Sequence, residues 1–429
     1  MVHINHDGLQ PGMKLARKVE DRQGRLLMAA GTELTDRHIR SLRLWGITAV
    51  DVEGDEPENT SKSEIAAPLS AETVETAKAL TAKAFCHNMS HRNHPFIRQV
   101  TVIYFSRLVR QLQKDKTVAD KVLMLNQSNP PLTPTALPSG NARRKRPTLD
   151  EFVRGTKTIM SLPAVYNEIV RVVNDPRSSA TDVANIISGD TGLTARLLRL
   201  VNSAFYGFPG KVDTVTRAIT LVGLSQLCEL ALATSVMGVS SKGAGSHIDL
   251  PAFWKHSLCC GVVTRLLAEH KHETNPERYF VTGLLHDIGR LVILTQLPDL
   301  ALEAIRAAQT TRQPLSAMED AHIGFTHADV GRALLENWNL PPSQRQAVFR
   351  HHRPLEGGEY VTEVAATHLA DVIAHVMGTG LNGELALPPF QPQAWDHLAL
   401  APEILPALID EADMQVKDLA GIFDLEERR

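Results

Sequence analysis

The sequence has few cysteines, few aromatic residues and no long apolar run. Four cysteines in 429 residues are too few for a disulfide framework, which favours a reducing cytoplasm. The adjacent Cys259 and Cys260 lie in an apolar run and are expected to be buried thiols. No stretch approaches the roughly 20 apolar residues that span a bilayer, and the N-terminus has no apolar signal segment. We therefore expect a cytoplasmic protein without membrane contact.

Neither sign of charge dominates. The 45 basic and 48 acidic residues give a formal net charge of -3, so bulk attraction to nucleic acid is not expected. Residues 182–203 have the cadence of a helix-turn-helix. Their second helix carries only Arg196 and Arg199, which disfavours a DNA-binding regulator. Apolar residues make up 43% of the chain and charged residues 22%, which indicates a packed core in two or three domains.

The N-terminal part is the only β-rich stretch. Within residues 1–55, two strands are expected around a turn at 21–24, and the segment ITAVDVE predicts another strand. Between them, Thr35 is expected to cap a short helix that ends near Gly46. The fold class is therefore mainly α, with a small β-rich N-terminal domain.

Two polar stretches divide the rest of the chain. Residues 54–70 and 126–147 are rich in polar residues and proline, so both are predicted to be linkers, the second one flexible. Between them, residues 71–125 form a helical segment in which Pro95 is expected to end a helix. His87, His91 and His94 follow a helical spacing and could bind a metal, but a solvated helix face is preferred because no Cys or carboxylate accompanies them.

Strong helical periodicity begins near residue 148. Apolar residues recur in stripes, of which Val165, Ile169 and Val172 are one, and Leu193, Leu197, Leu200 and Val201 another. Ser179 and Asp182 resemble a capping box, and Gly223 is expected to end a later helix. At the end of one helix, Asn202 and Tyr206 are expected to brace a neighbouring loop.

Separated motifs after residue 155 resemble the HDOD domain, a relative of the HD phosphohydrolases. In chain order they are Leu162-Pro163, Gly192-Leu193, Val201-Asn202-Ser203 with Tyr206, Ala218-Ile219, Val222-Gly223-Leu224, FWKHS, GLLHDIGRLVI, the Glu319 and His327 segment, ENWNLP, FRHHRP, HLADVIAH and AWDHLALAPEILPALI. The resemblance implies a helical bundle over residues 148–429, with its core at about 155–350 and closing helices at about 351–429. The segment from PGM through GRLLMAAGTELT resembles a small domain that precedes HD-GYP modules.

His286 and Asp287 are adjacent in an apolar helix. Burying both without partners would be expensive. A divalent cation would satisfy both side chains, because neutral imidazole and carboxylate are ordinary ligands of Fe, Mn or Zn.

The resemblance to the HD superfamily extends this pair to seven candidate ligands. It implies one metal site formed by His256, His286, Asp287 and Asp371, with Asp287 free to bridge, and a second site formed by His327, His351 and His352. A metal-bound water would then be the nucleophile that attacks a phosphodiester.

Several features depart from catalytic HD-GYP proteins. The segment HHRPLEGGEY contains no Gly-Tyr-Pro element, and Ala252 stands where some HD-GYP enzymes have a third-metal glutamate. Arg290 stands where they have lysine; it could bind phosphate or pair with a surface carboxylate. We therefore expect a signalling module that binds a partner protein or a nucleotide second messenger. The alternative is a metal-dependent phosphodiesterase acting on a cyclic dinucleotide, with Asp287 and Arg290 as catalytic residues.

Overall fold

The structure is a computed structural model. It describes residues 2–5, 9–20, 26–35, 38–39, 42, 49–53, 71–114, 146–156, 164–173, 175–203, 205–208, 210–237, 249–379, 386–423 and 425. Some sequence predictions lie outside the described residues. They are the turn at 21–24, the helix end near Gly46, the linker 54–70, the linker 126–147 up to residue 145, and the Leu162-Pro163 motif.

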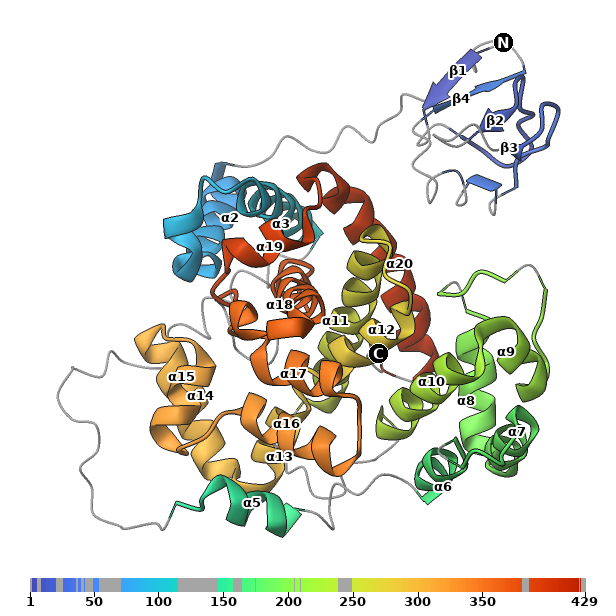
Figure 1. The fold of residues 1–429 in the computed structure, drawn as a ribbon. Helices are drawn as coiled ribbons and strands as arrows, with labels where there is room; N and C mark the ends of the chain where they lie inside the picture. The colour runs from blue at the N-terminus through green and yellow to red at the C-terminus, as the bar shows by residue number, and fades with distance from the viewer. Residues whose placement is uncertain are drawn as a thin grey trace. The chain divides into compact units, whose positions relative to one another are not determined.

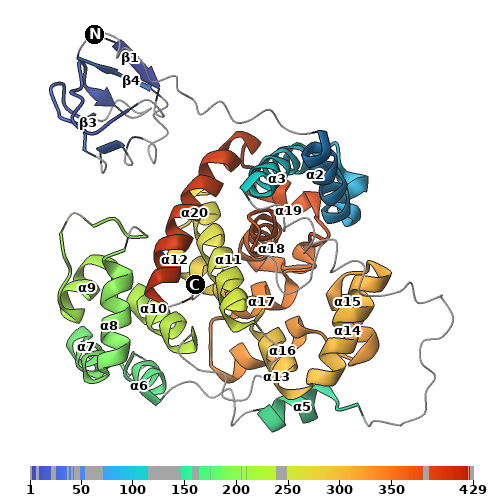
Figure 2. The same cartoon turned by 180° about the vertical axis from the view of Figure 1, so that it is seen from behind.

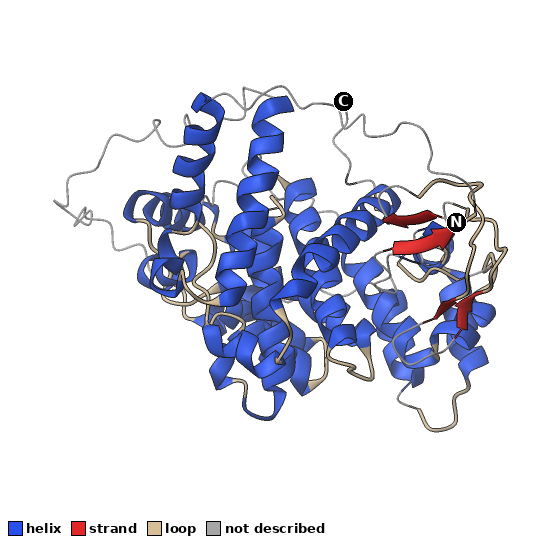
Figure 3. Ribbon diagram, turned by 90° about the horizontal axis from the view of Figure 1, so that it is seen from above, coloured by secondary structure: helices blue, strands red, loops and turns tan. Residues whose placement is uncertain are grey.

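The chain is mainly α-helical, as predicted (Figure 3). It divides into two compact units, Met1–Ala71 and Glu72–Arg429. Within the described ranges, no single helix is long and apolar enough to cross a membrane. One pair of described helices, Val215–Val222 and Leu224–Met237, meets the requirement of length and composition when the two are taken together, and this pair is bent by 118°.

The first unit contains short antiparallel strands (Figure 1). Strand β1 (Val2–Asn5) pairs with β4 (Ala49–Val52), and β2 (Val19–Glu20) pairs with β3 (Leu26–Met28). The last three strands agree with those expected from the sequence, whereas β1 was not expected. The Thr35 hydroxyl accepts a hydrogen bond from the His38 amide at 3.2 Å, which is the expected cap contact. The side chains that form this unit's core are Leu9, Leu15, Val19, Met28, Leu34, Leu42, Val50 and Val52.

The second unit begins with the helices that precede α11. These are α2 (Ala71–Ala84), η2 (Cys86–His91), α3 (Pro95–Lys114), α5 (Leu149–Thr156), α6 (Ala164–Val173), α7 (Ala180–Gly189), α8 (Thr191–Val201), α9 (Val215–Val222) and α10 (Leu224–Met237).

The prediction that Pro95 ends a helix is wrong. Pro95 is the first residue of α3, where its missing N–H costs nothing and its fixed φ suits the first turn. The preceding break is a 3₁₀ turn, so His87, His91 and His94 do not share one α-helical face. The rings of His91 and His94 instead lie edge-on to Phe390, with centroids 6.1 and 5.0 Å away. This contact also contradicts the expected solvated face.

Helix α3 belongs to the same compact unit as the C-terminal helices (Figure 2). Phe96 is buried, and its ring centroid lies 4.9 Å from Phe390 and 4.7 Å from Trp395. The buried Asn88 amide donates to Pro388 O at 3.1 Å and accepts from the Phe390 amide at 2.7 Å. The described part of the predicted helical segment 71–125, which ends at Lys114, therefore packs against residues that are far away in sequence.

Local signals in α7, α8 and α9 are confirmed. Ser179 and Asp182 form a capping box at the start of α7, and Gly223 ends α9 with a φ of 98°. The predicted brace is also present, because the Asn202 side chain donates to Val212 O and accepts from the Val212 amide, both at 2.7 Å.

The remaining helices surround a buried centre. They are α11 (Leu250–His270), α12 (Pro276–Leu285), α13 (Ile288–Gln296), α14 (Pro298–Thr311), α15 (Leu315–His322), α16 (His327–Asn337), α17 (Pro342–Arg350), η3 (Pro354–Glu356), η4 (Gly358–Tyr360), α18 (Val361–Val376), α19 (Pro392–Leu398), η5 (Pro402–Ile404) and α20 (Leu405–Ile422). Helix α11 packs against α12, α18 and α20. Every residue of α18 from Glu363 onward is buried, so polar side chains on its inner face need partners within the unit.

Glycines allow two helix pairs to approach closely. A Cβ at Gly283 of α12 would lie 2.5 Å from Cys260 O of α11, and a Cβ at Gly289 of α13 would lie 2.0 Å from His327 O of α16. Both distances are far below van der Waals contact. These two approaches fix the turn between α12 and α13 against α11 on one side and α16 on the other.

Candidate metal centre

The seven predicted ligands come from five places in the fold. His256 lies on α11, His286 and Asp287 form the turn between α12 and α13, and His327 begins α16. His351 and His352 directly follow α17, and Asp371 lies on α18. All are buried except His352, which is partly buried. The motifs are scattered in sequence, but the packing of the helices brings them together.

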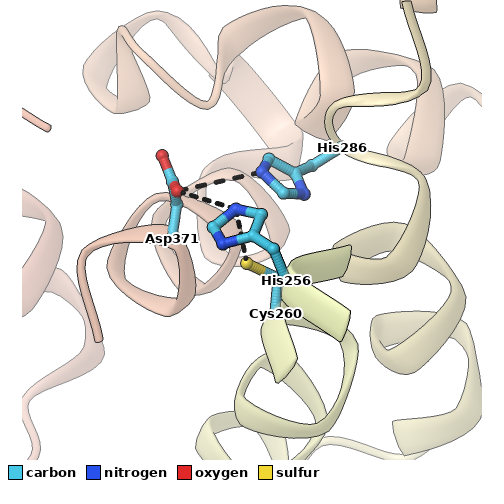
Figure 4. A group of neighbouring side chains, drawn as sticks. All are labelled: His256, Cys260, His286 and Asp371. Atoms are coloured by element: carbon cyan, nitrogen blue, oxygen red, sulfur yellow. Dashed lines mark hydrogen bonds and ion pairs between the residues drawn. The ribbon is translucent and has the colours of Figure 1, made fainter. Parts of the chain in front are cut away.

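One group gathers around Asp371 (Figure 4). His256 Nε2 lies 3.4 Å from Asp371 Oδ1, and His286 Nε2 lies 3.9 Å from the same oxygen. The Sγ atom of Cys260 also belongs to this group, 3.5 Å from His256 Nε2. The four ligand atoms all lie within 4.8 Å of one another.

A neighbouring group gathers around Asp287. His327 Nε2 and His351 Nε2 lie 3.2 and 3.8 Å from Asp287 Oδ1, and His286 Nε2 lies 3.6 Å from Asp287 Oδ2. The two imidazoles His327 and His352 face each other with Nε2 atoms 2.9 Å apart.

The structure brings the predicted ligands together in overlapping groups. His327, His351 and His352 lie close enough to share an ion. Asp287, which was expected in the first site but free to bridge, lies with His286 of that site and His351 of the second, and not with His256 and Asp371. The reason is that Asp287 follows the end of α12 and is carried toward α16, as the close approach at Gly289 requires.

The protein fixes the tautomers of three histidines. The Nδ1 atoms of His256, His286 and His351 lie 2.9, 2.8 and 2.6 Å from the carbonyls of Thr379, Gly283 and Val348. Because a carbonyl only accepts, each Nδ1 donates, and each Nε2 presents its lone pair to the cluster. Metal-binding histidines are oriented in the same way.

One of these lone pairs has no protein partner. Among the described residues, no group forms a hydrogen bond with the buried His351 Nε2. A buried polar atom without a partner is costly, and a divalent cation would satisfy it. The residues present therefore fit a metal ion.

The electrostatics of the cluster favour ionised carboxylates. Burial alone would raise the pKa of Asp287, but His286, His327 and Arg290 outweigh burial and hold that pKa well below its usual range. Burial likewise opposes the charge of Asp371, and the imidazoles of His256, His375 and His286 around it outweigh burial and hold its pKa well below the ordinary value. Ionised carboxylates are the form that binds a cation.

The histidines divide into two kinds. Burial, together with His286 and His327, lowers the pKa of His351 to about 3, so its imidazole is neutral, as a ligand must be. For His327, burial also opposes the charge, but Glu319 and Asp287 prevail and raise the pKa to about 9. The Glu319 contact is short, with Oε2 2.6 Å from His327 Nδ1.

Three participants were not predicted from the sequence. Cys260 was interpreted only as a buried thiol, although it stands one helical turn after His256 on α11. Glu319 was recognised as part of a motif without a role. His375 places Nδ1 3.2 Å from Asp371 Oδ1, and its position one turn after Asp371 was the only available signal.

Arg290 also differs from expectation. Its Nη1 atom lies 3.5 Å from Asp287 Oδ2, and its side chain is 6% exposed. The carboxylate that it meets is thus a buried candidate ligand and not a surface group. Arg290 is a counter-charge for Asp287 inside the cluster.

Comparison with known proteins agrees with this fold. Residues 159–354 match the family model of the HDOD domain, so the chain contains an HDOD domain. The match includes six of the seven predicted ligands, from His256 to His352, and ends before Asp371.

Solved structures share the fold. A Shewanella amazonensis protein, provisionally named a phosphohydrolase, is 25% identical with a TM-score of 0.52, over 63% of this chain and 97% of that one. An HDOD domain protein of unknown function from Geobacter sulfurreducens is 22% identical with a TM-score of 0.52, over 65% and 98% of the two chains.

A curated relative extends beyond the matched part. An uncharacterized protein of Treponema pallidum is 26% identical over 216 residues, which are 50% of this chain and 42% of the relative. The match thus spans less than half of that protein's length.

Proposed function

We propose that this protein is a signal-transduction regulator whose HDOD domain contains a metal-bound histidine-aspartate cluster and responds to a partner protein or a nucleotide second messenger. The observation that carries the proposal is the enclosure of a complete ligand set. The side chains of His256 and His351 are 0% exposed and that of Asp287 is 6% exposed. Catalytic metal sites keep a coordination position open to substrate, whereas structural sites are closed. An enclosed ion would stabilise one arrangement of α11, α13, α16 and α18.

A patch on α16 and α17 favours an anionic ligand. The guanidinium groups of Arg332, Arg350 and Arg353 lie 4.2, 4.4 and 5.8 Å from the ring centroid of Phe349. Glu356 contacts Arg350 and Arg353, which leaves positive charge in excess around a partly buried aromatic ring. Arginine binds phosphate bidentately, and an aromatic ring can stack on a base. Phe349 and Arg350 directly precede His351, and Arg353 directly follows His352, so a nucleotide bound at the patch would be coupled to the cluster through the end of α17.

A second candidate function is phosphodiester hydrolysis. It is favoured by the retained ligand set and by the likeness to the Shewanella protein named a phosphohydrolase. His352 is the least buried of the seven, so the group of His327, His351 and His352 would be the side open to substrate.

Replacement of Asp287 by asparagine separates the two functions. We would measure metal content by mass spectrometry, unfolding temperature with and without a chelator, and hydrolysis of a cyclic dinucleotide with Mn or Fe added. A matched control is Asp413→Asn, which removes a carboxylate that is ion-paired with Arg107 far from the cluster in sequence. We expect wild type and control to bind metal, to lose stability in the chelator, and to show no hydrolysis. Asp287→Asn should lower the metal content.

Two results would contradict the proposal. If wild type binds no metal and is indifferent to chelator, the cluster is only a set of core hydrogen bonds. If wild type hydrolyses the dinucleotide in a metal-dependent manner and Asp287→Asn abolishes turnover, the second candidate function replaces the first.

A further inference from the structure

Cys260 offers the cluster a ligand of a different chemical kind. It is fully buried on α11, one helical turn after His256, and its Sγ atom points toward the same space as His256, His286 and Asp371 (Figure 4). The close approach of α12 at Gly283, where a Cβ would meet Cys260 O, holds this part of α11 next to His286.

Three of the six separations among these four atoms are close to those of tetrahedral coordination, and all six are below 4.8 Å. With metal–nitrogen and metal–oxygen bonds of about 2.0–2.1 Å and a metal–sulfur bond of about 2.3 Å, neighbouring ligand atoms lie about 3.3–3.6 Å apart. His256 Nε2 lies 3.5 Å from Cys260 Sγ and 3.4 Å from Asp371 Oδ1. The separation of His286 Nε2 from Asp371 Oδ1 is 3.9 Å, which needs only a few tenths of an ångström of contraction.

We propose that Cys260 is a metal ligand, and that His256, Cys260, His286 and Asp371 together form a closed four-coordinate site. This inference rests on the metal binding proposed above and adds a residue and a selectivity to it. As the metal–sulfur bond forms, the thiol proton passes to solvent and the thiolate keeps the electron pair. A thiolate among the ligands selects Zn²⁺ or Fe²⁺ over Mn²⁺, because soft sulfur suits those ions.

The competing explanation is an ordinary hydrogen bond of the thiol, either within α11 or to α18. The Cys260 thiol lies 3.5 Å from His256 Nε2 and 3.9 Å from Ala370 O, so it could donate to either one without any ion. The experiment must therefore detect a metal–sulfur bond and not merely the loss of a buried thiol.

The adjacent Cys259 provides a matched control. It is equally buried, but its Sγ faces the Met377 sulfur at 3.5 Å and is outside the cluster. Wild type, Cys260→Ser and Cys259→Ser would be loaded with Co²⁺, and the thiolate-to-cobalt charge-transfer absorption recorded. We expect this band in wild type and Cys259→Ser and its absence in Cys260→Ser, whose Zn²⁺ affinity should fall by on the order of 10–100-fold or more.

X-ray absorption of the wild-type zinc protein gives a test that needs no variant, in case Cys260→Ser does not fold. A zinc–sulfur distance of about 2.3 Å supports the proposal. Bound zinc with only nitrogen and oxygen neighbours overturns the role of Cys260 and leaves the metal site standing. Absence of bound metal in wild type overturns both proposals.

Discussion

Substitution of Gly289 by alanine tests the packing that places the cluster. An alanine Cβ at this position would lie 2.0 Å from His327 O and 2.6 Å from the Gly331 amide nitrogen. Both neighbours are backbone atoms of α16, so neither can rotate away. Helices α13 and α16 would have to separate by roughly 1–1.5 Å to restore ordinary contact.

The expected cost is large for the addition of one methyl group. Overpacking of a core costs about 1–3 kcal/mol, and a clash between two backbones belongs at the upper end. Alanine regains up to about 1 kcal/mol of helix propensity, which leaves a net destabilisation of about 2 kcal/mol. The same separation would displace the turn before α13, which carries the candidate ligands His286 and Asp287, so metal affinity should fall as well.

Chemical denaturation followed by circular dichroism would measure the stability change, and metal titration the affinity. Gly189→Ala is the matched control, because Gly189 ends α7 in an exposed position with nothing within 4 Å of its Cβ direction. The control should be neutral or slightly stabilising. If Gly289→Ala proves as stable as Gly189→Ala and binds metal normally, the close approach of α13 and α16 is not what positions Asp287.

Two further predictions concern α20 and the arginine patch. Burial, together with Glu269, raises the pKa of Glu411 on α20 from its ordinary value to about 7. The folded state therefore holds this proton more tightly than the unfolded state. The free energy of unfolding should fall by about 2 kcal/mol as pH rises from about 4.5 to about 7. Glu411→Gln should flatten that part of the curve of unfolding free energy against pH, and an unchanged slope would refute the assignment. If a base stacks on the Phe349 ring, Phe349→Ala should weaken the binding of a cyclic dinucleotide, measured by calorimetry, by about 1–3 kcal/mol. The control Phe105→Ala on α3 should leave the affinity unchanged. Equal affinities of the two variants would exclude the patch as the nucleotide site.

Local chemistry is the part of the fold that could be predicted from sequence. The capping box of Ser179 and Asp182 and the helix end at Gly223 depend on residues a few positions apart, and both are confirmed. The position of Pro95 was predicted wrongly because proline is common in two places: just after the end of a helix and in the first turn of a helix. Only the residues on the C-terminal side of the proline distinguish the two positions, and here they are the apolar residues of α3.

Long-range pairing was beyond sequence reasoning. Strand β1 pairs with β4 across more than forty intervening residues, and β1 has no alternation long enough to signal a strand. The contact of Phe96 with Phe390 and Trp395 likewise joins distant segments, and nothing in either segment indicates the other. Such contacts are decided by which apolar faces remain uncovered after the local helices have formed.

The candidate site likewise has a part that could be predicted from the sequence and a part that depends on long-range packing. The family order of motifs supplied the residues from His256 to Asp371, and the structure places them in one cluster. The order could not say which side chains share an ion, because that depends on the direction in which the turn after α12 leaves the helix. Cys260 was overlooked for a related reason: a cysteine in an apolar run is usually a small hydrophobic side chain, and only the position of α18 reveals that it faces Asp371.

The hydrogen bond from His286 to Gly283 limits how many ions the cluster can take. His286 Nδ1 donates to Gly283 O, so this imidazole has a single lone pair, at Nε2, and can ligate one cation. Asp287 is already balanced by Arg290 and by His327, whose pKa is raised to about 9. The side chains that contact the Asp371 carboxylate in the described part of the chain are the imidazoles of His256, His286 and His375. A cation is therefore needed most beside Asp371, where the single lone pair of His286 can reach it. We expect a metal titration to fill the site beside Asp371 first. A second ion beside the unsatisfied His351 Nε2 should bind more weakly, because His327 must give up its proton. Two ions that bind with equal affinity would contradict this order.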